Sequence, residues 1–329
     1  MIYCQEKNIL LRYILLATVI FSGLLYISFK SRNIPMKAIP SDFIKPFQLS
    51  TELCYRADGT IFPFDQLKKL RVNNTDHKSA YVSESDAAKR PYISKDYTNL
   101  TEFIVNTREA FMSRRLNPGS HSIFNIFRNP PYKDMVKPSC DGLWMEFGVF
   151  RGSTLSHMAN WKRTFCGNDS EPVYGFDTFS GLPTHWRPGY GPGHFNVAEG
   201  EKIAVPSNAV LVKGLFIDTL PTHLRLIDRR FRCKTPVSFI HIDCDIYDGA
   251  RDVLFLLGSR LVSGTILVFD ELFNYPNYEK HEIKALFELL AGSNLRLLPI
   301  GASDNIDLKP LRDRTVQSFA FVTDIEKVQ

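Results

Sequence analysis

The stretch VSFIHIDCDIYDGARDVLFLLGSRLVSGTILVFDE, residues 237–271, shows a strand, a helix and a second strand in succession. The runs at 237–243 and 265–270 are apolar and rich in β-branched residues, and the run at 249–261 between them has helical spacing. Apolar strands that alternate with helices are typical of a parallel sheet covered on both faces. Both strands also end in carboxylates, which are seldom buried unless they are paired.

The same alternation of strands and helices continues on both sides of this stretch. Further strands are predicted at 143–147, 173–177, 209–214, 295–301 and 317–324, and further helices at 153–161 and 281–292. The last two strands are expected to form a hairpin. Residues 140–329 are therefore predicted to form an α/β domain with a doubly wound, Rossmann-like sheet of seven strands.

The chain upstream of this domain divides into four predicted segments. Residues 1–12 form a short tail, 13–29 a transmembrane signal-anchor, 30–60 a stem with three prolines, and 61–139 an extension with a helix at 98–116. The anchor YILLATVIFSGLLYISF has no charge, and its seventeen residues are near the short end of the ~17–25 that span a bilayer. A cleaved signal peptide is the alternative.

Two features of the sequence point to opposite membrane orientations. Basic residues are more frequent after the span than before it, which favours a cytosolic domain. Glycosylation sequons at Asn73, Asn99 and Asn168 favour a lumenal one. We predict a glycosylated single-pass protein of the endoplasmic reticulum or Golgi apparatus with its domain in the lumen. The six cysteines lack metal-ligand spacing and leave single disulfides open.

The composition excludes some classes of partner. The formal net charge of +5 is small for 329 residues, and no basic block resembles a nucleic-acid-binding arm. We therefore expect no nucleic-acid partner. Homo-oligomerisation is left open.

Acidic residues gather where the predicted strands end, which is the edge at which open α/β sheets bind ligands. They are Glu146, Asp177, Asp243, Asp245, Asp270 and Glu271. One or two such residues could be helix caps by chance, but six indicate a site.

The turn EFGVFRGST, residues 146–154, follows the first strand and lets the backbone approach a ligand through Gly148 and Gly152. It lacks the G-x-G-x-x-G pattern, which disfavours NAD. Asp177, at the tip of the next strand, could accept both hydroxyls of a ribose. Alternatively, it caps a helix.

Five motifs together resemble the macrocin O-methyltransferase family, whose members are class I S-adenosylmethionine-dependent enzymes that methylate sugar hydroxyls of macrolides. They are WMEFGVFRGSTL, VYGFDTFSGLPTHW, VKGLFIDTLP, FIHIDCDIY and VFDELFNYP, and they lie in the family's order between residues 143 and 301. The resemblance implies a seven-stranded class I methyltransferase sheet. It also implies that Glu146, Gly148, Gly152 and Ser153 hold the methionine part of S-adenosylmethionine, and that Asp177 binds its ribose.

The resemblance further implies a divalent cation, usually Mg²⁺, held by Asp243, Asp270 and Glu271. Carboxylate oxygens suit Mg²⁺, and three crowded carboxylates would repel one another without a cation; separate helix caps are the alternative. The cation would lower the pKa of the acceptor hydroxyl, and Asp243 or Asp245 would take its proton as general base. Asp245 could equally cap the next helix, and His241 fits a buried, hydrogen-bonded histidine better than a base.

The segment SGLPTHWRPGYGPGHFN, residues 180–196, has the composition of a binding loop. Trp186 and Tyr190 could stack on a sugar ring, and His185 and Arg187 could bind its hydroxyls; an ordinary surface loop is the alternative. The expected function is S-adenosylmethionine-dependent, metal-assisted O-methylation of a sugar, glycan or glycosylated small molecule. The rivals are a cytosol-facing enzyme for small metabolites or lipids, and a non-catalytic membrane-anchored relative.

Overall fold

The computed structural model describes residues 93–112, 138–168, 170–302 and 319–325. The predicted tail, anchor and stem, and most of the extension at 61–139, lie outside these ranges. The predicted localisation, a single-pass protein of the endoplasmic reticulum or Golgi apparatus, is contradicted: within the described ranges no helix is both long enough and apolar enough to cross a membrane. The segment chosen as the anchor, 13–29, is not among the described residues.

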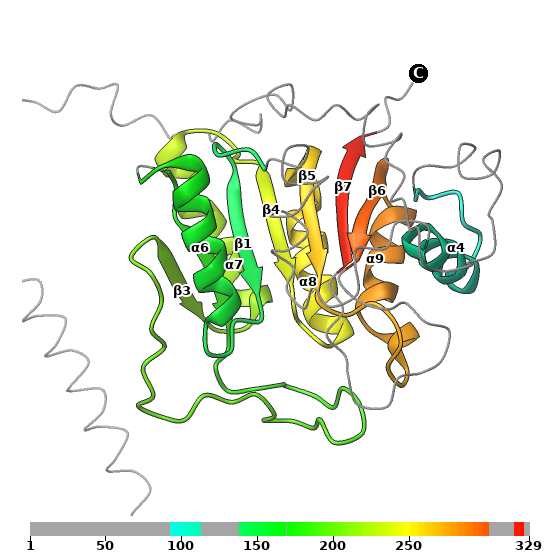
Figure 1. Cartoon of the computed structure of the whole chain (residues 1–329), viewed down its shortest axis with the longest axis horizontal. Coiled ribbons are helices and arrows are strands. Elements are labelled where there is room, and N and C mark those ends of the chain that lie inside the picture. Colours follow the sequence, from blue (N-terminus) through cyan, green and yellow to red (C-terminus); the bar gives the residue numbers. More distant parts are fainter. Residues whose placement is uncertain (1–92, 113–137, 169, 303–318, 326–329) are drawn as a thin grey trace, which may run out of the picture. The chain divides into compact units, whose positions relative to one another are not determined.

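Seven strands form one mixed sheet in the order β3-β2-β1-β4-β5-β7-β6 (Figure 1). The strands are β1 (Leu143–Phe147), β2 (Val173–Asp177), β3 (Ala209–Lys213), β4 (Val237–Ile242), β5 (Leu261–Phe269), β6 (Leu295–Ala302) and β7 (Phe319–Ile325). The first five run parallel, and β7 pairs antiparallel with both β5 and β6. The seven predicted strands are thus confirmed, including the antiparallel pairing of the last two.

Helices pack on both faces of the sheet, as the doubly wound prediction requires (Figure 1). They are α4 (Leu100–Met112), α6 (Ser153–Cys166), α7 (Phe216–Phe231), α8 (Tyr247–Leu257) and α9 (Glu282–Ala291), with short 3-10 turns η4 (Gly258–Arg260) and η5 (Tyr278–Lys280). Among the described helices, α6 packs on Trp144 and Phe239 of one face, and α4, α7, α8 and α9 pack on the other. Because both faces are covered, every residue of β4 is buried.

Helix α7 is not among the elements predicted from the sequence, although its apolar residues have helical spacing. Leu220, Leu224 and Ile227 are buried along one side of this helix. Pro221 lies inside it, and a proline removes one helical N–H and usually ends a helix. The helix predicted at 249–261 also ends early, at Leu257, because η4 leads into a longer β5.

The start of α4 is fixed by reciprocal capping. Asn99 Oδ1 accepts a hydrogen bond from the backbone N–H of Glu102 at 2.9 Å, and Glu102 Oε2 accepts one from the backbone N–H of Thr98 at 3.1 Å. Phe103 and Phe111 of this helix are fully buried. The helix predicted at 98–116 is therefore confirmed over Leu100–Met112; residues 113–116 are not described.

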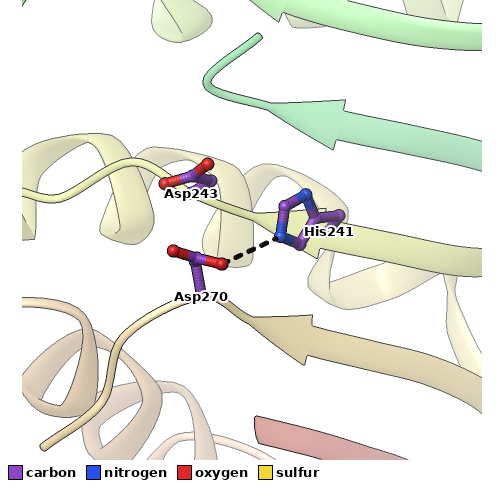
Figure 2. A group of neighbouring side chains, drawn as sticks. All are labelled: His241, Asp243 and Asp270. Atoms are coloured by element: carbon purple, nitrogen blue, oxygen red, sulfur yellow. Dashed lines mark ion pairs between the residues drawn. The ribbon is translucent and has the colours of Figure 1, made fainter. Parts of the chain in front are cut away.

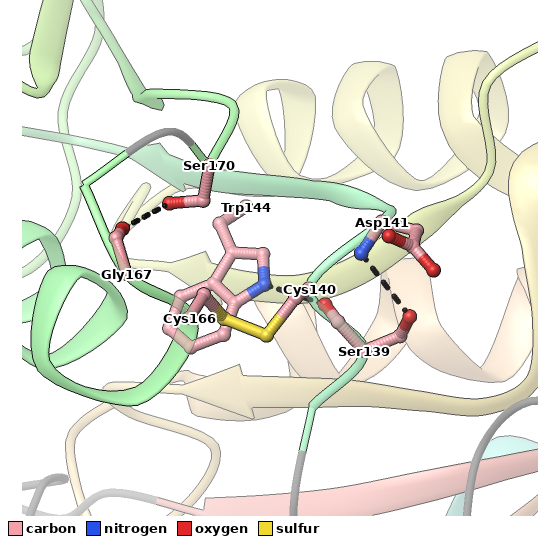
Figure 3. The surroundings of a disulfide bond; sticks show 7 residues. All are labelled: Ser139, Cys140, Asp141, Trp144, Cys166, Gly167 and Ser170. Atoms are coloured by element: carbon pink, nitrogen blue, oxygen red, sulfur yellow. Dashed lines mark hydrogen bonds between the residues drawn. A yellow bond between two sulfur atoms is a disulfide. The ribbon is translucent and has the colours of Figure 1, made fainter.

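A disulfide between Cys140 and Cys166 joins the approach to β1 with the last residue of α6 (Figure 3). Beside it, Trp144 Nε1 donates a hydrogen bond to the Ser139 carbonyl at 3.0 Å. The sequence leaves this pairing open. The link joins residues 26 positions apart, for which chain entropy predicts about 3.5 kcal/mol of stabilisation.

Lys162 of α6 is a buried lysine next to Trp144. Its Nζ lies 5.3 Å from the centre of the Trp144 ring and has no hydrogen-bond partner in the part of the chain that the structure describes. Burial lowers the pKa of Lys162 to about 8, against a smaller opposing effect of Glu171 and Asp141. The folded chain therefore loses this proton at a lower pH than the unfolded chain.

We expect Lys162→Met to stabilise the fold at pH 7, by up to about 3 kcal/mol, since the protonated amine is costly to bury. The unfolded chain binds the extra proton between pH 8 and 10.5, so the stability of the unmodified chain should rise across that window and the gap to the variant should close. Urea unfolding of both proteins at several pH values measures this. An exposed control, Lys202→Met, corrects for the general effect of removing a lysine. Parallel stability curves would contradict the assignment.

Candidate active site

The carboxyl ends of β1, β2, β4 and β5 meet at one edge of the sheet, and the ladder continues one residue beyond three of them. Gly148 donates from its N–H to the Phe176 carbonyl at 3.0 Å, Asp243 to Phe147 at 2.8 Å, and Asp270 to Ile242 at 2.9 Å. The two aspartates are consequently held by backbone hydrogen bonds at the ends of neighbouring strands. This register explains why acids far apart in the sequence lie together.

Gly148 leaves no room for a side chain against the backbone of Asp243. It has φ +90°, and a Cβ built on it would lie 1.7 Å from the carbonyl oxygen of Asp243. Only glycine fits here, both because of this contact and because other residues seldom adopt such a φ. The turn after β1 therefore packs directly against the backbone of Asp243, at the end of β4.

Two groups of side chains that could hold a metal ion share Asp243. One contains His241, Asp243 and Asp270, and the other contains Asp243, Asp245 and Glu271; within each, the candidate ligand atoms all lie within 4.8 Å of one another. Figure 2 shows Asp243 and Asp270 side by side at the ends of β4 and β5. Asp270 and Glu271 thus each share a group with Asp243, but no group contains all three predicted metal residues, whose shared site remains a prediction.

Burial and mutual repulsion make these carboxylates hard to ionise. Burial first, and then the neighbouring Asp270, raise the pKa of Asp243 and that of Glu271 well above their ordinary values. The same two causes raise the pKa of Asp245 to about 8, although Arg187 opposes the shift. Asp270 is partly open, with its side chain 24% exposed. If all of these acids were ionised, the cluster would hold more negative charge than the nearby His241 and Arg187 offset.

His241 is a buried histidine between two acids, as the sequence analysis favours. Its Nδ1 lies 2.9 Å from Glu146 Oε1, its register partner on β1, and its Nε2 lies 3.9 Å from Asp270 Oδ1, an ion-pair distance (Figure 2). Burial lowers its pKa, but Asp270 and Glu146 outweigh burial and raise the pKa of His241 to about 10. Glu146 thus engages Nδ1 of His241, and Nε2 is the ring nitrogen that faces Asp270 in the first metal-capable group.

Asp177 already has three partners. Its Oδ2 accepts hydrogen bonds from the backbone N–H groups of Val149 and Phe150, both at 2.8 Å, and its Oδ1 accepts one from Phe179 at 2.7 Å. Asp177 therefore fixes the turn after β1 and the start of its own loop. A carboxylate has about four acceptor sites, which leaves room for about one ribose hydroxyl and not for both without rearrangement.

The remaining residues predicted to hold the donor differ in how open they are. Glu146 is fully buried and bonded to His241. Gly152 is covered by the side chains of Ile203 and Val205. Ser153 is exposed at the start of α6, where no side chain caps the helix. These residues are close in the chain, but the turn presents mainly its backbone to a ligand.

A cavity of about 680 Å³ lies beside this turn, between the loop after β2 and the end of β3. Its lining includes Phe179, Asn196, Glu201, Leu211 and Lys213, and none of the residues predicted to bind the donor. It adjoins Asp177 through Phe179. The cavity lies toward the β3 side of the sheet rather than over the acid cluster.

The predicted substrate loop folds onto the acid cluster. Trp186 is buried, with its ring centre 5.4 Å from that of Tyr275. Arg187 stacks on Trp186 at 4.0 Å and on Tyr190 at 4.4 Å and is close enough to influence Asp245. His185 is exposed. The structure thus brings Arg187 and Tyr190 to the site, whereas Trp186 packs as a core residue of the loop.

Two further residues face the cluster without having been expected from the sequence. Glu282, the first residue of α9, is fully buried and accepts hydrogen bonds from the backbone of the turn that carries Asp245. Tyr275 is buried near Glu282 and Glu271, and burial raises its pKa well above the ordinary value. In the sequence, Glu282 looks like any acid in the first turn of a helix, so only its burial reveals it. The first residue of α8, by contrast, follows Ile246 without a side-chain cap, so Asp245 does not cap this helix.

Comparisons with known proteins give the following result. No family model and no curated protein matches the chain. Among solved structures, CalS11, a calicheamicin methyltransferase, is 21% identical and matches over 78% of this chain and 90% of its own, with a TM-score of 0.42. The O-methyltransferase NovP is 19% identical over 67% and 78%, with a TM-score of 0.38. A TehB-like S-adenosylmethionine-dependent methyltransferase from Corynebacterium glutamicum is 14% identical over 69% and 98%, with a TM-score of 0.33. Similarity this low does not indicate an activity, and the resemblance to the macrocin family stays a prediction.

Proposed function

We propose that this chain is an S-adenosylmethionine-dependent, divalent-metal-assisted O-methyltransferase that acts on a hydroxyl of a sugar, glycan or glycosylated small molecule. One observation carries the proposal: carboxylates from two neighbouring strand ends meet at Asp243, directly against the glycine turn after β1. The resemblance to the macrocin O-methyltransferase family supports S-adenosylmethionine as the methyl donor. The motifs that carry this resemblance form the same edge of the sheet.

The residues around Asp243 fit a divalent cation. Asp243, Asp270 and Glu271 offer hard oxygen ligands, and Glu271 Oε2 is buried without a hydrogen-bond partner among the described residues. Burial and repulsion raise the pKa of Asp243 and of Glu271, so a cation would stabilise their ionised forms. We assign these three residues as its ligands.

The chemistry divides between bound groups and side chains. When bound, the cation would supply Lewis-acid assistance to the acceptor hydroxyl, and S-adenosylmethionine would supply a sulfonium methyl group. We propose Asp245 as the residue that accepts the hydroxyl proton, because its carboxylate lies beside Asp243 and Glu271 and close to Arg187. Arg187 offsets part of the negative charge beside it. Alignment of the acceptor oxygen with the methyl carbon is then mainly a matter of positioning.

For the donor we propose the space between the Gly148 turn and the cavity beside β3. Asp177 contributes by holding the backbone of that turn and by offering its remaining acceptor site to a ribose hydroxyl. For the acceptor we propose the side of the cluster under the loop, where Arg187 and Tyr190 lie. A sugar could stack on Tyr190 and receive hydrogen bonds from Arg187.

The proposal is tested by methyl transfer from labelled S-adenosylmethionine to simple glycosides with the purified full chain. We expect turnover that EDTA abolishes and Mg²⁺ restores, while circular dichroism shows the fold unchanged. Turnover that is indifferent to EDTA would remove the metal. Methylation of lipids or small metabolites alone would change the acceptor class, and failure to bind the donor in titration calorimetry would refute the methyltransferase assignment.

A further inference from the structure

Glu282 connects α9 to the turn that carries the catalytic acids. Its Oε1 accepts hydrogen bonds from two consecutive backbone N–H groups, that of Cys244 at 2.9 Å and that of Asp245 at 3.2 Å. The glutamate is fully buried, and 37 residues of sequence separate it from Asp245. Two successive N–H groups that point at one carboxylate oxygen form an anion-binding nest of backbone.

The strand ladder does not hold the whole of the turn at 243–245 in place. Asp243 is fixed by the strand ladder through its N–H bond to Phe147, but Asp245 lies beyond the last ladder bond. Asp245 has φ +63°, a left-handed conformation that side-chain-bearing residues other than Asn, Asp and His rarely adopt. The side chain of Asp245 meets Asp243 and Glu271 only while the turn keeps this conformation.

We propose that Glu282 is a positioning residue: it holds the turn at 243–245 in the conformation that brings Asp245 to Asp243 and Glu271. It acts through the two backbone N–H groups and touches neither donor nor acceptor. The catalytic consequence rests on the proposed function, whereas the contact itself does not. The two can therefore be tested separately.

Backbone hydrogen exchange at Cys244 and Asp245, measured on the full chain without metal, tests the contact. Glu282→Ala should speed exchange of these two amides about tenfold or more, because each loses its hydrogen-bond acceptor. Glu282→Gln keeps an acceptor oxygen at the same reach and should restore most of the protection. Glu109→Ala, which removes an exposed glutamate of α4, is the matched control and should change neither amide.

A second measurement covers the case in which the alanine variant does not fold. In Glu282→Gln, the amide protons of Cys244 and Asp245 should change chemical shift more than other amides of the chain, because the group that accepts their hydrogen bonds is the one replaced. Unchanged exchange and unchanged shifts would overturn the inference.

The functional consequence is measured as Mn²⁺ affinity and methyl-transfer rate. Glu282→Ala should lower the rate about tenfold or more, and Glu282→Gln should recover most of it, in step with the exchange data. Altered amides with an unaltered rate would overturn the positioning role. If the unmodified chain neither binds Mn²⁺ nor transfers methyl groups, the proposed function fails, and the exchange experiment still decides what Glu282 does to the turn.

Discussion

Asp243→Asn should reduce methyl transfer roughly 100-fold or more and weaken divalent-metal binding with it. Asp243 is shared by both groups of metal-capable side chains, so its charge contributes to whichever of them holds a cation. The asparagine keeps the size of the side chain and its backbone hydrogen bond to Phe147 but loses the charge. Steady-state rates with labelled donor, together with calorimetric titration of Mn²⁺, measure the two losses on one preparation.

Substitutions of the neighbouring acids distinguish a metal ligand from the general base. Asp270→Asn should behave like Asp243→Asn, whereas Asp245→Asn should lower the rate and leave Mn²⁺ affinity nearly unchanged if Asp245 is the base. Asp248→Asn is the matched control, because Asp248 is an exposed acid in the first turn of α8 and pairs with Arg251. A rate for Asp243→Asn that equals that of Asp248→Asn would exclude Asp243 from the chemistry.

The meeting of the strand-end acids was predictable because parallel strands bring their carboxyl ends to one edge. Once 237–243 and 265–270 are read as neighbouring strands, Asp243 and Asp270 must lie close together. The grouping of the acids was not predictable to the same degree. It depends on the left-handed turn at Asp245, and one side chain that holds this turn comes from α9. Sequence spacing carries no signal for such a contact.

Contacts between paired strands are likewise difficult to predict from the sequence alone. Glu146 and His241 are register partners on β1 and β4, so each satisfies part of the other's hydrogen-bonding capacity inside the sheet. A motif can identify Glu146 as a strand-end acid, but it does not show that its side chain faces a histidine. Likewise, glycine and proline identify 180–196 as a long loop, whereas the burial of Trp186 against Tyr275 follows only from how that loop folds back.

Among alanine substitutions of the glycines at this edge of the sheet, Gly148→Ala should lower the stability of the fold most. The new Cβ would lie 1.7 Å from the carbonyl oxygen and 2.7 Å from the carbonyl carbon of Asp243, and both are backbone atoms that cannot move aside cheaply. Either β1 or the end of β4 must shift, and the positive φ adds its own cost. We expect a loss of stability of about 3 kcal/mol or more, since overpacking and an unfavourable φ act together.

Gly167→Ala supplies the matched control for that experiment. Gly167 has φ +87°, nearly the same as Gly148, but a Cβ there would meet no atom within 4 Å. Its loss of stability should be about 1–3 kcal/mol, because φ +87° with ψ 174° is a backbone conformation that almost only glycine adopts. The difference between the two variants in urea unfolding then measures the collision with Asp243. Because the collision displaces Asp243, Gly148→Ala should also lose methyl transfer under conditions in which it remains folded, while Gly167→Ala keeps it. Equal stability losses and equal rates for the two variants would show that the turn after β1 does not press against Asp243, and would remove the contact on which the arrangement of this site depends.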